Sequence, residues 1–229
     1  MSKKVKSLLL VLCALVFAVA GIFATLAYLQ DADEVNNTVT IGDIDMIMDE
    51  GHFEGIDDYG VISFDKTVRV DNNEYHLIPG VTYPKDPTIH IADVSEPAYV
   101  FVRVENGLAG LEAEDGNTIA DQMEALGWKP VGGSYANVFV YNGDLCVDGK
   151  EYIVNGKVDA VVQENGLKTI DIPVFTQFKV DPAADTDKGD PNLVDFKDAK
   201  VNIKAVAIQV VGFENYTQAL EEVKGHLGY

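Results

Sequence analysis

Residues 37–48, with the sequence NTVTIGDIDMIM, alternate apolar and polar side chains once Gly42 is allowed as a bulge. Successive side chains of a strand point to opposite faces, so this spacing gathers the apolar residues on one side. Four residues form that apolar face: Val39, Ile41, Ile44 and Met46. We therefore expect a single strand here, with one face buried in a core.

Similar alternating stretches recur along the chain, at 61–70, 98–105, 137–141, 151–154, 157–163, 168–180 and 200–211. Between them lie pairs whose glycine tolerates the positive φ of a tight turn: Asn106-Gly107, Asn142-Gly143, Asp148-Gly149, Asn155-Gly156 and Asn165-Gly166. Many short strands joined by tight reversals favour antiparallel sheets over parallel crossovers. The predicted fold is all-β, an antiparallel β-sandwich.

Two short helices are expected to interrupt the strands. Asn117 or Thr118 can cap a segment that ends at Gly127, where a left-handed cap is expected. Nearer the C-terminus, Asn215 and Gln218 resemble a capping box ahead of an apolar stripe. We expect both helices to cover the open ends of the sheets.

The N-terminus has the order of a signal peptide: lysines, then an uncharged apolar stretch over 8–27, then acidic residues from Asp31. The positive charges keep the start of the chain in the cytoplasm, so the rest is exported. We expect cleavage between Ala27 and Tyr28, because small residues precede that bond. The alternative is an uncleaved anchor, since about 20 apolar residues span a bilayer as a helix.

Cleavage at this bond divides the chain into a signal peptide, residues 1–27, and a single domain, residues 28–229. A domain of that length is ample for a buried core. The mature protein is then secreted, and it meets the membrane only before the signal peptide is removed.

The composition is strongly acidic, with 37 acidic residues against 17 basic ones and a formal net charge of −20. Such a chain repels phosphate backbones and anionic lipids, so we expect no nucleic-acid partner. Self-association should depend on salt or divalent cations, because like charges must be screened before two subunits touch.

Cys146 is the cysteine that remains after cleavage, so no intrachain disulfide is expected. Within Asp144-Leu145-Cys146-Val147 it alternates like a small buried strand residue. The alternative is a reactive thiol.

The four histidines, His52, His76, His90 and His226, do not form the His-Glu-x-x-His motif of zinc proteases. His52 falls within the glycine-flanked stretch 51–55, which predicts a loop, and His76 and His90 lie on either side of a proline-containing loop. The chain also lacks a Gly-x-Ser-x-Gly elbow and a phosphate-binding glycine loop. We therefore expect no catalytic site and no enzyme activity.

An acidic stretch with two prolines, residues 181–192, predicts an exposed loop. Its carboxylates are weak candidates for a calcium site: Asp181, Asp185, Asp187 and Asp190. Measured against an EF-hand that starts at Asp185, Phe196 occupies the place of the bidentate glutamate, so the spacing fails. A solvated loop without metal is the alternative, and no other cofactor is expected.

Several stretches, in this order, resemble the TasA and camelysin family of exported Gram-positive proteins. The matching segments are GIFATLAYLQD at 21–31, NTVTIGDI at 37–44, LIPGVTYPKDPT at 77–88, AYVFVRV at 98–104 and IKAVAIQ at 203–209. One position departs from the family pattern, because Leu29 stands where a second aromatic residue is usual.

The resemblance implies a jelly-roll-like sandwich, processing by a signal peptidase of the SipW type, and a place in extracellular fibres or on the surface of a biofilm-forming bacterium. In fibre-forming relatives the freed N-terminal segment pairs with the next subunit, which makes residues 28–48 a candidate donor strand. Val39, Ile41, Ile44 and Met46 would then fill sockets on the acceptor.

Three alternatives remain open at this point. The N-terminal segment can instead form the first strand of its own sandwich, as in any monomer. The protein can also be a monomeric cell-surface binding module or adhesin. A third alternative is a surface metalloendopeptidase like camelysin.

Overall fold

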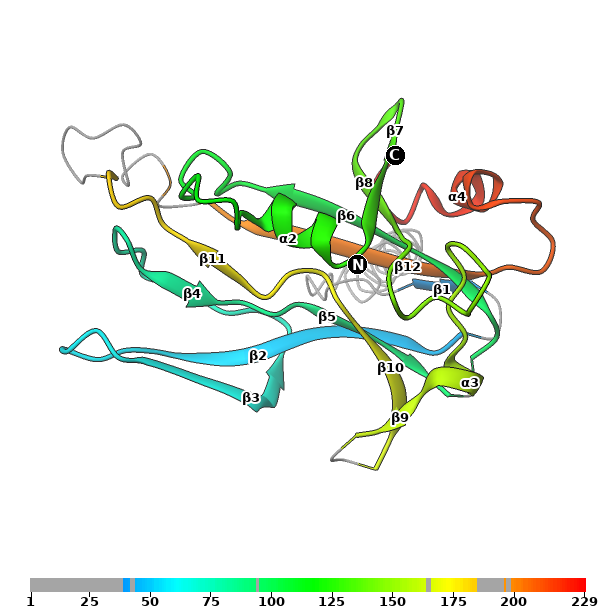
Figure 1. Ribbon diagram of the computed structural model, residues 1–229, viewed down its shortest axis with the longest axis horizontal. Coiled ribbons are helices and arrows are strands. Elements are labelled where there is room, and N and C mark those ends of the chain that lie inside the picture. The colour runs from blue at the N-terminus through cyan, green and yellow to red at the C-terminus, as the bar shows by residue number, and fades with distance from the viewer. Residues whose placement is uncertain (1–38, 42–43, 94, 164–165, 185–195, 197–198) are drawn as a thin grey trace, which may run out of the picture. The chain divides into compact units, whose positions relative to one another are not determined.

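Two sheets of five strands each form the core of the protein in this computed structural model (Figure 1). The structure describes residues 39–41, 44–93, 95–163, 166–184, 196 and 199–229. The chain divides into two units, Met1–Val35 and Asn36–Tyr229, and every described residue belongs to the second.

The first sheet, sheet A, has the order β1 (Val39–Ile41), β12 (Val201–Gln209), β6 (Ala98–Asn106), β8 (Tyr135–Tyr141) and β7 (Trp128–Gly132). The second, sheet B, has the order β3 (Ile62–Val70), β2 (Met46–Ile56), β5 (Thr88–Ala92), β10 (Lys168–Pro173) and β9 (Val161–Val162). A small third sheet pairs β4 (Thr82–Pro84) with β11 (Gln177–Lys179). The chain crosses between the two large sheets after β1, β5, β8 and β10, which confirms the all-β sandwich.

Antiparallel pairing holds the described strands together with one exception, the parallel pair of β1 and β12. In that pair Val39 lies opposite Val206 and Ile41 opposite Ile208. The antiparallel prediction is therefore correct for the body of the sandwich and wrong for its first strand.

The main core lies between the sheets and is built from the inward positions of both. Val100 and Val102 on β6 belong to one apolar cluster with Ile89 on β5 and Ile170 on β10. Burying each such aliphatic side chain contributes about 1.5–3 kcal/mol, so this layer supplies much of the folding free energy.

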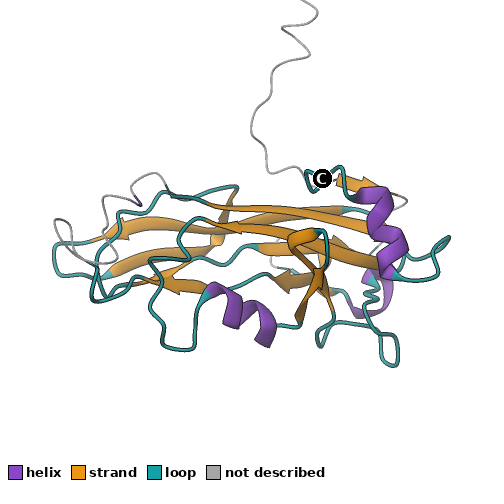
Figure 2. Cartoon of the chain, turned by 90° about the horizontal axis from the view of Figure 1, so that it is seen from above, coloured by secondary structure: helices purple, strands orange, loops and turns teal. Residues whose placement is uncertain are grey.

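A second apolar cluster covers the outer face of sheet A. Helix α4 (Tyr216–Val223) packs Leu220 and Val223 there, against Phe101 on β6 and Ile208 on β12. Residues 98–102 of β6 and 205–208 of β12 are therefore buried on both faces, which explains why these stretches are continuously apolar. Figure 2 shows the helices on the outside of the strands.

Both predicted helices form. Helix α2 (Ile119–Ala125) begins with a capping box between Thr118 and Asp121, and the chain leaves it through Gly127 at a φ of 92°. In α4 the Asn215 side chain accepts a hydrogen bond from the backbone of Gln218. A further helical turn, α3 (Gly156–Asp159), lies where the sequence predicts a strand. No helix in the described part of the chain is both long and apolar enough to cross a membrane.

Several predicted strand boundaries are wrong. The expected strand 37–48 is split, since β1 belongs to sheet A and β2 to sheet B. Residues 151–154 form a turn that ends in an isolated bridge at Val154, and 168–180 divides into β10 and β11. The sequence reading also missed β4, β5 and β7. These errors share a cause: alternation is a local signal, whereas distant partners decide where a strand begins and ends.

Candidate functional site: the outer edge of strand β12

Strand β12 presents a long, regular edge to its surroundings. On one side it pairs with β6 along its whole length, from Val201 to Gln209. On the other side, among the residues that the structure describes, it pairs only with β1, at Val206, Ala207 and Ile208. Within the described residues, the backbone of residues 201–205 has no strand partner on that side, which is the condition for adding another strand.

Elsewhere in the described sandwich, the outermost strands are poor acceptors. β7 contains Pro130 and a register shift, β3 pairs with β2 through two register shifts, and β9 has only two residues. Proline, bulges and short length are the usual protections of a sheet edge against added strands. The edge of β12 has none of these features.

Strand β1 occupies its place on β12 with few contacts. It has three residues, its pairing is parallel, and only residues 42–45 separate it from β2 in the opposite sheet. Parallel pairs are slightly less stable per residue than antiparallel ones, so β1 is held weakly. The same strand from another copy would restore the same pairing, so the exchange costs little.

The residues predicted as the assembly strand divide into two groups. Ile44 and Met46 are buried in the core of their own chain, between the sheets. Val39 and Ile41 lie on β1, which comes before these buried residues in the chain. A segment that leaves the domain without opening its core must therefore end before Ile44.

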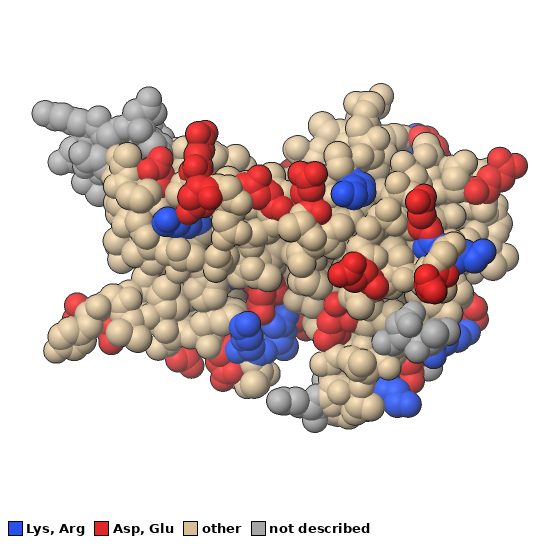
Figure 3. All heavy atoms as spheres, viewed as in Figure 1, with Lys and Arg blue, Asp and Glu red and all other residues tan. Residues whose placement is uncertain are grey.

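Two lysines, one on β12 and one just before it, lie near the outer edge of this strand. Acidic side chains are spread over the face seen in Figure 3, with lysine and arginine in smaller groups. Lys200 and Lys204 are exposed, and Lys204 lies opposite Arg103 on β6. Within the described residues, neither lysine has an ion-pair partner.

A polar network crosses the outer face of sheet B, centred on His90 of β5. Its Nδ1 atom lies 2.7 Å from Oδ1 of Asp171, and its Nε2 atom lies 2.9 Å from Oδ1 of Asp49. Arg69 donates from Nε to the same Asp49 oxygen at 2.7 Å. The network therefore ties together β2, β3, β5 and β10.

The charges in this network set the protonation of its members. Burial acts to lower the pKa of His90, but the hydrogen bonds to Asp49 and Asp171 outweigh it, so the pKa is raised. For Asp49, burial acts to raise the pKa, yet the bonds from His90 and Arg69 prevail and the pKa is lowered. The network thus favours the charged forms of His90 and Asp49.

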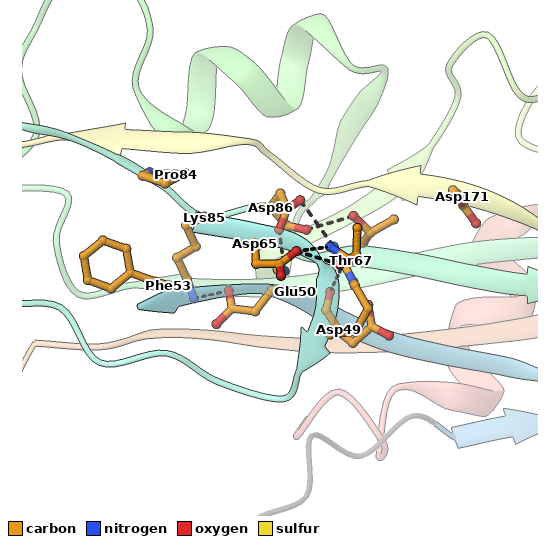
Figure 4. A network of polar contacts seen from close by, with 12 residues as sticks. Asp49, Glu50, Phe53, Asp65, Thr67, Pro84, Lys85, Asp86 and Asp171 are labelled. Atoms are coloured by element: carbon orange, nitrogen blue, oxygen red, sulfur yellow. Dashed lines mark hydrogen bonds and ion pairs between the residues drawn. The ribbon is translucent and has the colours of Figure 1, made fainter. Parts of the chain in front are cut away.

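The Lys85-Asp86-Pro87 stretch clamps β2 against the start of β5. Lys85 lies with its Nζ atom 2.5 Å from Oε2 of Glu50, a buried ion pair that Figure 4 shows from close by. Asp86 accepts a hydrogen bond at 2.7 Å from the backbone nitrogen of Gly51. Lys85 and Asp86 therefore hold the adjacent β2 residues Glu50 and Gly51 in place, so this stretch has a structural role.

The remaining histidines, His52, His76 and His226, do not form a cluster in the described structure. His52 lies in β2 next to a bulge, so the predicted glycine-flanked loop is wrong, and His76 and His226 are exposed. Both ring nitrogens of His90 already face carboxylates. In the described part of the chain, no three His, Cys, Asp or Glu side chains are grouped so as to hold a metal ion.

Other sequence predictions fall partly outside the described residues. Among the calcium candidates, the structure describes only Asp181, which accepts a hydrogen bond from the backbone of Ala183 at 2.8 Å. The other three candidates, Asp185, Asp187 and Asp190, lie outside the described residues. The predicted cleavage site, Ala27 and Tyr28, also lies outside them. Cys146 lies in a turn instead of the predicted strand, half-buried against the core, and burial raises the pKa of its thiol.

Sequence reasoning missed the edge of β12, the His90 network and the Glu50–Lys85 pair. An alternating strand looks the same whether or not its neighbour is present, so the edge leaves no local signal. A scan against models of protein families, a search of curated proteins and a search of solved structures each found no match for this chain.

Proposed function

We propose that the chain is an exported structural protein that assembles into extracellular fibres by strand addition at β12. The N-terminal segment of one subunit, residues 28–41, takes the place of β1 on the next subunit. The observation that carries this proposal is the edge of β12, where, among the described residues, β1 pairs with three of nine residues, while β3, β7 and β9 carry protective features.

The energetics of strand addition fit this edge. An incoming strand gains main-chain hydrogen bonds along the side of residues 201–205 that has no partner among the described residues. Because Ile44 and Met46 stay in the core of the donor, its own sandwich remains closed while the segment before them moves. The segment exchanged is therefore residues 28–41, shorter than the range 28–48 expected from the resemblance.

Charge supports the same pairing. The N-terminal segment carries Asp31, Asp33 and Glu34, whereas the acceptor edge carries Lys200 and Lys204. In a chain with a net charge of −20, this local complementarity lowers the repulsion between subunits where they meet. Salt screens the remaining repulsion, so assembly should quicken as ionic strength rises.

The place of the protein outside the cell rests on the signal-peptide pattern of residues 1–27 and on the resemblance to the TasA and camelysin family. A SipW-type signal peptidase is the processing partner which that resemblance implies. Removal of the signal peptide frees the N-terminal segment, and the extracellular matrix or cell surface of a Gram-positive bacterium is where fibres then form. This role involves no catalysis.

Deletion of residues 28–41 from the mature chain tests the proposal. The truncated protein should fold, because every described strand except β1 lies after residue 41. It should form no fibres by electron microscopy, whereas the chain that starts at Tyr28 should form them. Fibres from the truncated protein, or a full-length protein that stays monomeric at every salt concentration, would contradict the proposal and favour a monomeric surface-binding module.

A peptide of residues 28–41 gives a complementary test. Added to the truncated protein, it should bind and raise the melting temperature, because it restores the missing edge strand. A scrambled peptide of the same composition is the control. Equal binding of both peptides would show that attraction between charges, not strand pairing, accounts for the interaction.

A further inference from the structure

The tip of the β2–β3 hairpin holds an aromatic side chain in solvent. Tyr59 is 91% exposed, and Val61 beside it is 59% exposed. The hairpin reaches the left end of the view in Figure 1. Tyrosine is enriched at protein–protein interfaces, so an exposed tyrosine at a hairpin tip is a candidate contact residue.

Hydrogen bonds fix the tip before any partner binds. The carboxylate of Asp57 accepts from the backbone nitrogens of Tyr59 at 2.9 Å and Val61 at 2.8 Å. Asp57 also pairs with Val61 through its backbone nitrogen, and Gly60 donates to the carbonyl of Asp57. Because the loop is ordered in advance, binding through Tyr59 loses little conformational entropy.

A surface hollow that could receive an aromatic side chain lies on sheet A, beside α2 and the outer strand β7. Its volume is about 240 Å³, and it is lined by Ala120, Glu124, Trp128, Lys129, Pro130 and Phe139. Trp128 is almost fully buried beneath it, with its indole nitrogen donating to the carbonyl of Pro173, so the accessible apolar lining comes from Pro130 and the half-buried Phe139. Pro130 prevents strand addition at β7 but leaves the hollow open to an inserted side chain.

We propose that Tyr59 of one copy inserts into this hollow of a second copy. The ring packs against Pro130 and Phe139, and its hydroxyl group can donate to the Glu124 carboxylate. Asp58 at the tip then meets Lys129 at the rim, so opposite charges face each other.

The contact joins different surfaces of the two copies. Tyr59 does not fill the hollow of its own chain, because it is almost fully exposed. A knob and a hollow on separate parts of one molecule make a heterologous contact, which continues from copy to copy unless rotation closes a ring. The inference rests on the proposed fibre function and adds to it a second contact between subunits, independent of β12.

Cysteine cross-linking tests the contact directly. The mature chain, residues 28–229, keeps the whole of the unit Asn36–Tyr229. In a Cys146→Ser background, Tyr59→Cys combined with Ala120→Cys should give a ladder of disulfide-linked oligomers under mild oxidation. Val211→Cys combined with Ala120→Cys is the matched control, since Val211 is a 73% exposed apolar residue on another loop. An equal ladder from the control would overturn the proposal.

Substitution of the tip gives the quantitative test. Tyr59→Ser should raise the protein concentration needed for assembly roughly tenfold, the loss expected for one aromatic anchor, whereas Val211→Ser should have little effect. Lys129→Glu should weaken assembly, and Asp58→Lys in the same chain should restore it. Unchanged assembly for Tyr59→Ser, or no rescue by the charge exchange, would overturn the contact.

These outcomes separate the contact from strand addition. If Tyr59→Ser assembles normally while deletion of residues 28–41 abolishes fibres, the contact is wrong and the proposed function stands. If the cross-linked ladder persists in the protein without residues 28–41, the contact is supported and strand addition is not required. If neither change affects fibres, both proposals are wrong.

Discussion

Nδ1 of His90 on β5 lies 2.7 Å from Oδ1 of Asp171 on β10, so two neighbouring strands of sheet B are joined by side chains as well as by their backbones. Asp49 on β2 faces the other ring nitrogen at 2.9 Å. Each carboxylate is bonded further, Asp49 to Arg69 and Asp171 to Gln163 and Thr169. The imidazole lies at the centre of the network.

This arrangement predicts a pH window for stability. The pKa of His90 is raised above its ordinary 6.5, so its contribution is fully present below that pH and is lost as pH rises through the folded value. The pKa of Asp49 is lowered below its ordinary 3.8, so its contribution is present above that pH and is lost as pH falls through the folded value. The network should stabilise the fold most between these two ordinary values.

Replacement of His90 by glutamine checks the window. Glutamine can donate to one carboxylate but carries no charge, so His90→Gln should lower the free energy of unfolding by about 1–3 kcal/mol at pH 6. At pH 9 the loss should be smaller, because a larger share of His90 has lost its charge and the neutral ring also donates only once. Urea unfolding at both pH values measures the difference. His226→Gln, at an exposed position, is the control, and equal losses for His90→Gln at both pH values would refute a charged His90.

The Glu50–Lys85 pair predicts a large effect from a single change. Both side chains are largely buried, with 4% and 12% of their surface exposed. Lys85→Met leaves the Glu50 carboxylate buried without its cation and should cost about 3–5 kcal/mol. The double variant Glu50→Leu with Lys85→Met should regain most of that loss, as thermal unfolding can show. A single variant as stable as the native chain would contradict the buried pair.

Two glycines that look alike in the sequence should respond differently to alanine. A Cβ atom at Gly143 would lie 2.6 Å from the carbonyl oxygen of Leu126, so Gly143→Ala should destabilise the fold by about 1–3 kcal/mol through crowding. At Gly149 a Cβ atom meets nothing within 4 Å, and the cost should come only from its φ of 71°, about 1 kcal/mol. Paired unfolding curves compare them; a larger loss at Gly149 would contradict the packing at Gly143.

These glycines also show what the sequence could and could not reveal. Each follows Asn or Asp, and that pair correctly marks a turn. Gly149 has the positive φ that the pair predicts, whereas Gly143 is needed because Leu126 and Tyr141 approach it closely. Turn chemistry is local and can be predicted from neighbours, but a close approach depends on segments that meet only in the folded chain.

The same distinction applies to the candidate site. Alternation over 37–48 correctly indicated that Ile44 and Met46 are buried. It could not reveal that the strand is divided between two sheets, because the position of β1 is set by its pairing with residues 206–208, far along the chain. Likewise, His90 was visible only as an isolated histidine, since its partners Asp49 and Asp171 come from separate strands.

The central claim, that the N-terminal segment is donated to another copy, can be tested at one pair of positions. Thr40 on β1 lies opposite Ala207 on β12 in the parallel register. Two mature proteins, one with Thr40→Cys and the other with Ala207→Cys, both with Cys146→Ser, are mixed under fibre-forming conditions and oxidised. Donation predicts a disulfide-linked heterodimer of the two proteins, identified by their different tags on a non-reducing gel. If the heterodimer is absent, while a single chain carrying both cysteines closes its disulfide internally and stays monomeric, the strand belongs to its own domain and the account of assembly is wrong.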